Sequence, residues 1–182
     1  MKKIAVILLF AIASNGLFAQ VLEETQQAPL TKREKREAER ELQYELTEYM
    51  LENRSFVLEA DFLQGRFGSR VYVNSTINFI AVDSTEATIQ IGSNWRVGPN
   101  GVGGVTAKGR ITKWELTENE KRNTFHLAMN VMTSIGIYDV RFSIGPDGRT
   151  SARLTGLRPG QLTFDGDLVP LEESSVFEGQ SI

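Results

Sequence analysis

The chain changes its hydrophobic periodicity once, near Ser55. Before that point, from Lys32 to Glu52, apolar residues recur at spacings of three and four, which indicates one stripe of an amphipathic helix. Thr31 precedes this segment and Glu34 follows three residues later, a pattern typical of a capping box at a helix N-terminus. The first half of the helix is almost entirely charged, which is typical of a solvated face. The stripe consists of Ala38, Leu42, Leu46, Tyr49 and Met50.

From Ser55 to Leu171 apolar and polar residues alternate with a period of two, which indicates half-buried strands. One long strand is expected to contain Val71, Val73, Ile77 and Phe79. About eight strands follow one another with short turns and no helical pattern between them, so consecutive strands should pair antiparallel. Closing such a meander removes its exposed edges. We therefore predict a mostly β fold, an antiparallel β-barrel of about eight strands preceded by one N-terminal amphipathic helix, with a two-sheet sandwich as the alternative.

The first 19 residues have the composition of a secretory signal peptide. Lys2 and Lys3 form a positive start, Ile4 to Ala13 is apolar, and Ala19 is a small residue at the expected cleavage position. The apolar run is shorter than the roughly 20 residues that span a bilayer, so we expect cleavage after Ala19, with an uncleaved anchor as the alternative. The expected organisation is a signal peptide at 1–19, a leader and charged helix at 20–54, a β-barrel domain at 55–171 and a flexible tail at 172–182.

Composition narrows the class of protein. The 182 residues include 20 basic and 23 acidic side chains, a net charge of −3, and no basic run, so nothing favours nucleic-acid binding. The chain has no cysteine, which excludes disulfides, thiolate nucleophiles and cysteine metal sites. We expect a periplasmic or secreted protein that has no cofactor, no metal and no membrane span after signal cleavage, and that is stabilised by its core.

The order of these features is similar to that of a known family. Four segments carry the similarity: a first strand at Ser55–Ala60, a strand after a glycine-rich segment at Ile111–Trp114, the next strand at Thr124–Met129, and a last strand at Gly160–Gly166. From Thr31 to Leu171 the chain resembles the secreted or lipid-anchored Bacteroidetes envelope proteins of domain of unknown function 4251. The resemblance implies a lipocalin-like barrel and no assigned activity. Many relatives carry a cysteine where this chain has Ala19-Gln20, so we expect a soluble protein.

The glycine-rich segment from Gly92 to Leu116 is the first candidate for a binding function. A phosphate-binding loop would need a helix after Gly98–Gly104, but β-type residues follow and Gly-Lys-Ser/Thr is absent. Two interpretations remain, a passive hairpin loop and a mobile lid over a barrel mouth, where ligand pockets commonly lie. In the lid, Trp95 and Arg96 would supply contact area and hydrogen bonds. Trp114 completes the predicted ligand-binding set.

Few residues have the pattern of a catalytic or metal site. His126 is the only histidine, and it alternates with Phe125 and Leu127, so we expect His126 to face outward and its neighbours inward. One histidine cannot form a histidine-rich metal site, and no G-x-S-x-G motif is present. Glu59 and Asp61 lie two apart on one predicted strand face. Such a pair can perform acid–base chemistry or bind calcium, although a solvated face is the simpler interpretation.

Ser84 is a candidate modification site. The run Asp83-Ser84-Thr85 resembles the site at which Bacteroidetes attach O-linked sugars to exported proteins. An ordinary turn is the alternative interpretation.

Together these patterns predict an exported, non-enzymatic binding domain for a small apolar or amphipathic ligand or for an envelope partner. The alternatives are a hydrolase with a site at the barrel mouth and a purely structural interaction module. An open apolar cavity would favour the binding domain. A cleft with convergent polar groups would favour the enzyme, and a filled interior with an exposed apolar patch would favour the interaction module.

Overall fold

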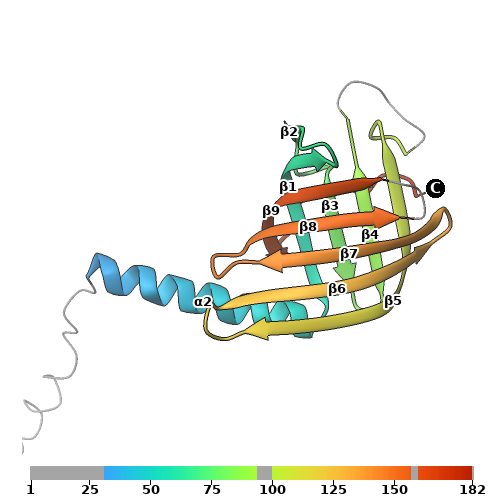
Figure 1. The fold of residues 1–182 in the computed structure, drawn as a ribbon. Coiled ribbons are helices and arrows are strands. Elements are labelled where there is room, and N and C mark those ends of the chain that lie inside the picture. Colours follow the sequence, from blue (N-terminus) through green and yellow to red (C-terminus); the bar gives the residue numbers. More distant parts are fainter. Residues whose placement is uncertain (1–30, 94–99, 157–159, 182) are drawn as a thin grey trace, which may run out of the picture. The chain divides into compact units, whose positions relative to one another are not determined.

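The computed structural model describes residues 31–93, 100–156 and 160–181 (Figure 1). The chain divides into two units, 1–38 and 39–182, with the boundary inside helix α2, Lys32–Glu52. At the start of α2 the Thr31 amide donates to the Glu34 carboxylate at 2.7 Å, and the Glu34 amide donates to the Thr31 hydroxyl at 3.3 Å. The backbone hydrogen bond, then the side-chain one, lowers the pKa of Glu34. The predicted capping box is therefore present. Among the described helices, none has the length and apolar character needed to cross a membrane.

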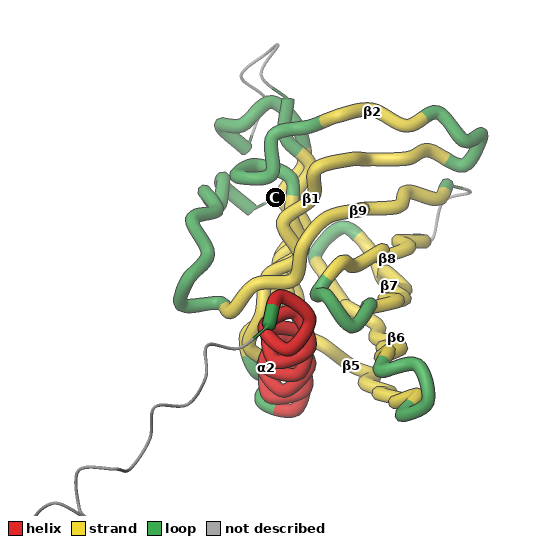
Figure 2. Tube along the Cα trace, turned by 90° about the vertical axis from the view of Figure 1, so that its left-hand side faces the viewer, coloured by secondary structure: helices red, strands yellow, loops and turns green. Residues whose placement is uncertain are grey.

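The strands form one antiparallel sheet that closes on itself (Figures 1 and 2). The described strands are β1 (Ser55–Gly65), β2 (Arg70–Tyr72), β3 (Phe79–Asp83), β4 (Glu86–Ile91), β5 (Val105–Asn119), β6 (Thr124–Thr133), β7 (Gly136–Ile144), β8 (Arg149–Gly156) and β9 (Gln161–Pro170). From β3 to β9 each strand pairs with the next, and β1 pairs with both β3 and β9. Without β2, which pairs only with β1, eight strands make a closed up-and-down barrel. The predicted barrel is confirmed, and the sandwich alternative is wrong because the β1–β9 pairing closes the sheet.

The predicted second strand is divided into β2 and β3 by a turn at Asn74. The Asn74 side-chain oxygen accepts hydrogen bonds from the Thr76 amide at 3.1 Å and the Thr76 hydroxyl at 2.9 Å. The Asn74 carbonyl also accepts from the Ile77 amide at 3.3 Å. Asparagine favours such local turns because its side chain replaces backbone partners. As a result β3 pairs with Ser55–Glu59 of β1, and β2 pairs with Phe62–Gln64 of the same strand.

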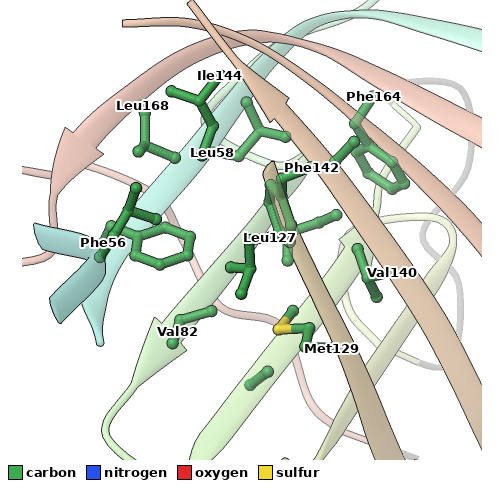
Figure 3. Packing of buried hydrophobic residues seen from close by; sticks show 14 of the residues in the cluster. Phe56, Leu58, Val82, Leu127, Met129, Val140, Phe142, Ile144, Phe164 and Leu168 are labelled. Carbon is green, nitrogen blue, oxygen red and sulfur yellow. The ribbon is translucent and has the colours of Figure 1, made fainter. Parts of the chain in front are cut away.

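Strand alternation determines which side chains enter the barrel. In β6, Phe125, Leu127, Met129 and Val131 are buried, whereas His126 is exposed, as predicted. Figure 3 shows Leu127 and Met129 among buried side chains from other strands, so the core has contributions from much of the barrel. The other labelled members are Phe56, Leu58, Val82, Val140, Phe142, Ile144, Phe164 and Leu168.

The part of α2 from Glu39 onward closes one end of the barrel. Met50 and Leu51 are 1% and 0% exposed and belong to the same core cluster as the strand residues. Tyr44 stacks on Phe125 with 5.1 Å between ring centroids. The Tyr44 hydroxyl donates a hydrogen bond to Glu118, which is the main cause that raises the pKa of Tyr44 to about 12. The interior is therefore filled and covered at the α2 end.

The C-terminal tail, predicted to be flexible, is hydrogen-bonded to the outer face of the barrel. The Gln90 amide group donates to the Phe177 carbonyl at 2.8 Å, and the Gly179 amide donates to Gln90 Oε1 at 2.7 Å. Ser174 donates to Glu59 at 2.7 Å. Gln90 is fully buried under this segment. Backbone groups of Phe177 and Gly179 therefore supply hydrogen-bond partners that the buried Gln90 side chain requires.

Candidate functional site

The end of the barrel opposite α2 contains a cavity. In an up-and-down barrel alternate connections lie at the same end, so the described residues of the β1–β3, β4–β5, β6–β7 and β8–β9 connections lie at this end. The cavity has a volume of about 630 Å³. Its described lining residues are Ile91, Val105, Ile135, Gly136, Tyr138, Leu154, Gly156, Gly160, Gln161 and Leu162. We call it the open-end pocket.

The wall of the open-end pocket becomes more exposed from its floor to its mouth. Leu154 is 8% exposed and pairs across the β8–β9 ladder with Leu162, which is half-buried. Val105 and Ile135 are 40% and 45% exposed and mark the mouth. No charged side chain occurs among the described lining residues. A pocket of this size and polarity suits a small apolar or amphipathic ligand and offers no charge to a strongly charged one.

A glycine shapes the pocket wall where β8 ends. Gly156 is the register partner of Tyr138 on β7, and both residues line the pocket. A Cβ atom at Gly156 would lie 3.0 Å from the Tyr138 ring. A larger residue at position 156 would displace the Tyr138 ring, so glycine at this position allows the ring to pack against β8.

The structure places only one member of the predicted ligand-binding set. Trp114 is half-buried, 6.3 Å from the Phe56 ring, and the Arg54 guanidinium lies 4.8 Å from its ring centroid. Arg54 is in the connection from α2 to β1, so Trp114 lies toward the closed end and does not line the open-end pocket. Trp95 and Arg96 fall outside the described residues.

The second half of the glycine-rich segment is organised around Asn100, which is 1% exposed. Its side-chain oxygen accepts from the amides of Val102 at 3.2 Å and Gly104 at 3.0 Å. Its side-chain nitrogen donates to the Thr106 hydroxyl at 3.1 Å, and its carbonyl accepts from the Gln180 amide at 2.9 Å. The side chain therefore holds the segment's own backbone, while the tail holds Asn100.

The hydrogen bonds of Asn100 affect how the predicted lid at Gly98–Gly104 can be tested. Gly98 and Pro99 fall outside the described residues, and 100–104 is held by the Asn100 contacts. Deleting Pro99–Gly103, which a passive loop would tolerate, would also remove Asn100. Such a deletion would therefore change stability whether or not a lid exists.

Each of the two predicted carboxylates, Glu59 and Asp61, contacts another side chain: Ser174 donates to Glu59, and Arg149 pairs with Asp61. A bulge between Ala60 and Phe62 interrupts the alternation at Asp61, yet both carboxylates lie beside Asp167: Glu59 is its register partner, and Asp61 shares Arg149 with it. Asp61 and Asp167 each lie 3.1 Å from the Arg149 guanidinium. Burial raises the pKa of Asp167, while Arg149 opposes that shift. Asp61 and Asp167 are therefore both ion-pair partners of Arg149.

Other predicted chemistry is also separated in space. His126 is exposed on β6, and its side chain has no hydrogen bond or ion pair within the described residues. In the same part of the chain no group of three or more histidine, aspartate or glutamate side chains is placed to hold a metal. Ser84 lies in the exposed β3–β4 turn with a φ of 53°, and its hydroxyl donates to Asp83 at 3.0 Å. The Ser84 hydroxyl is therefore accessible, and its glycosylation stays a prediction.

Sequence reasoning missed the residues that line the open-end pocket. They come from β4, β5, β7, β8, β9 and the β6–β7 and β8–β9 connections, and no local motif joins them. The available signal was an apolar residue beside a glycine at a strand end, as in Ile91-Gly92 and Ile135-Gly136. The glycine-rich segment drew attention to the same end of the barrel but to other side chains.

Comparison with known proteins agrees with this architecture. The family described as "Domain of unknown function (DUF4251)" matches residues 38–168. No curated protein matches the chain. A crystal structure of a DUF4251 family protein from Bacteroides eggerthii is similar, with 25% sequence identity, coverage of 75% of this chain and 93% of that chain, and a TM-score of 0.63. Because the family match covers most of the chain and the fold agrees, this protein belongs to the DUF4251 family.

Proposed function

We propose that this protein is a non-enzymatic binding domain that holds a small apolar or amphipathic ligand in the open-end pocket. The observation that carries the proposal is a cavity of about 630 Å³ with no charged lining residue in the described part of the chain. A hydrolase would need polar groups that converge on a cleft, and an interaction module would have a filled interior. An open apolar pocket favours ligand binding over both.

The gradient of exposure along the pocket suggests how an amphipathic ligand would lie. Its apolar part would contact Leu154 and Leu162, where burial of each square ångström contributes roughly 25 cal/mol. Its polar end would remain at the mouth near Val105 and Ile135, where solvent reaches both side chains. Because no lining charge would stabilise an ionic group at the floor, the polar end is expected outward.

Replacing Leu162 by glutamine tests the pocket. We expect the affinity for the apolar fluorophore N-phenyl-1-naphthylamine to fall about tenfold, because a polar group enters the wall and apolar contact is lost. Fluorescence titration in solution measures this change. Ile137→Gln is the matched control, since Ile137 is 44% exposed and does not line the pocket. Equal affinities for both variants, or no binding of the probe by the folded wild type, would contradict the proposal.

We also propose that the protein acts in the periplasm or outside the cell, after removal of residues 1–19. N-terminal sequencing of the mature protein from its host is expected to begin at Gln20, because Ala19 ends a segment with signal-peptide composition. Intact mass of the same sample would show whether Ser84 carries a sugar. Recovery of a chain that begins at Met1 in the membrane fraction would exclude this localisation.

A further inference from the structure

Most of the exposed apolar side chains in the described residues gather at the open end of the barrel. Seven of the ten large hydrophobic residues that are exposed lie in or beside the connections there. Phe67, Val71 and Tyr72 belong to the β1–β2 hairpin and are 86%, 59% and 75% exposed. Met132 and Ile137, a cross-strand pair, flank the β6–β7 connection. Ile135 and Val105 join this surface to the mouth of the pocket.

The charge at this end differs from that at the α2 end. The described residues of the open-end connections include Arg66 and Arg70 but no aspartate or glutamate. At the other end the β5–β6 and β7–β8 turns carry both signs of charge, Glu120 and Asp147 together with Lys121 and Arg122. In a chain with a net charge of −3, described connections that contain two arginines and no acidic residue suit the approach to an anionic surface.

The β1–β2 hairpin combines these two properties at its turn. The Arg66 guanidinium lies 4.5 Å from the Phe67 ring centroid and forms no ion pair within the described residues. Arg70 lies 3.9 Å from the Phe62 ring and 3.5 Å from the Asp165 carboxylate. In Figure 2 the hairpin lies at the end of the sheet beside β9. Because Phe67 has almost no cover, its ring contributes little to the stability of the isolated fold.

We propose that the open end docks on the surface of an anionic lipid bilayer. Phe67 and Tyr72 would enter the interface between headgroups and acyl chains, and Arg66 would contact lipid phosphates. We favour a bilayer over a protein as the partner because a bilayer presents anionic headgroups above apolar acyl chains. The arginine side chains would contact the headgroups, and the projecting aromatic rings would reach the apolar layer. Docking in this orientation would place the mouth of the open-end pocket against the lipid. This inference rests on the proposed function and adds that the ligand of the pocket would come from the bilayer.

Co-sedimentation with lipid vesicles tests the docking surface. The wild-type protein is expected to bind vesicles of equal parts phosphatidylcholine and phosphatidylglycerol more strongly than phosphatidylcholine alone, and less strongly as salt increases. Phe67→Ala should lower partitioning about tenfold. Arg66→Gln should lower it about fivefold, only on the anionic vesicles. Tyr49→Ala is the matched control, because Tyr49 is 65% exposed on α2, and it should leave partitioning unchanged.

Several outcomes would overturn the docking surface. Absence of vesicle binding, no preference for anionic lipid, or equal loss in Phe67→Ala and Tyr49→Ala would each do so. Capture of a protein partner through Phe67, without vesicle binding, would replace the bilayer with that partner. The fluorophore titration uses no vesicles, so its failure concerns only the pocket. A circular dichroism spectrum equal to that of the wild type would confirm that each variant is folded and that its change acts on the surface.

Discussion

Replacement of Phe125 by alanine is expected to lower the free energy of unfolding by about 3–5 kcal/mol. Phe125 is 2% exposed, belongs to the barrel core and stacks on Tyr44 of α2, so its removal leaves a cavity where the helix covers the barrel. Because the cavity lies between β6 and α2, the loss should include part of the contact that closes this end. Urea denaturation followed by circular dichroism measures the change.

His126→Ala is the matched control for Phe125→Ala. His126 is the next residue on β6 but is exposed and makes no side-chain hydrogen bond in the described residues. Its replacement should change the unfolding free energy by less than about 0.5 kcal/mol. Equal losses for the two variants would mean that β6 does not alternate between core and solvent as the structure has it.

Replacement of Asn100 by alanine is expected to lower the free energy of unfolding by about 2–3 kcal/mol. The side chain makes three hydrogen bonds, and the amides of Val102 and Gly104 and the hydroxyl of Thr106 lose a partner with it. Asn100 is 1% exposed, so water cannot readily replace those partners. Thermal unfolding of the two proteins measures the difference.

Asn130→Ala is the control for Asn100→Ala. Asn130 donates one hydrogen bond, of 2.6 Å, to Asp139 on the surface of the barrel, and we expect its loss to cost about 0.5–1 kcal/mol. If Asn100→Ala costs no more than this, the segment from Asn100 to Gly104 is not held by its hydrogen bonds. That result would restore the mobile lid as the better interpretation of the glycine-rich segment.

Two adjacent residues of the glycine-rich segment, Val105 and Thr106, connect the Asn100 contacts to the pocket. Thr106, at the start of β5, is fully buried and donates to Gln90, which also binds the tail. Val105, next to it, is exposed and lines the pocket mouth. The network from Asn100 to the tail therefore fixes one side of the mouth. An Asn100→Ala protein that remains folded should bind the apolar fluorophore less tightly, because this part of the wall loses its support.

Local features of the sequence predicted several parts of the fold correctly. The capping box needs only Thr31 and Glu34, which are one helical turn apart. The burial of Phe125 and Leu127 and the exposure of His126 follow from the period of a single strand. The barrel followed from a general argument, since many short strands in sequence leave exposed edges unless the sheet closes. Each of these properties depends on neighbours within a few residues or on the strand count.

The helix shows where periodicity was insufficient. Leu42 and Tyr49 belong to the predicted apolar stripe, yet they are 67% and 65% exposed. Met50 of the stripe is buried as predicted, but the other buried residues of α2 are Thr47 and Leu51, which lie outside the stripe. A stripe indicates an amphipathic helix, but the face that is covered depends on how the helix meets the barrel end. Thr47 can be buried because its hydroxyl donates to the Gln43 carbonyl at 2.8 Å, which needs no partner outside the helix.

For this protein, the sequence by itself determined the helix start, the phase of β6 and an antiparallel β-barrel. Only the tertiary structure decided the open-end pocket, the Asn100 contacts with the tail, and the position of Trp114 away from the mouth. The physical reason is distance along the chain. Alternation and capping act between residues a few positions apart, whereas Ile91, Tyr138 and Leu162 meet only after the sheet has closed.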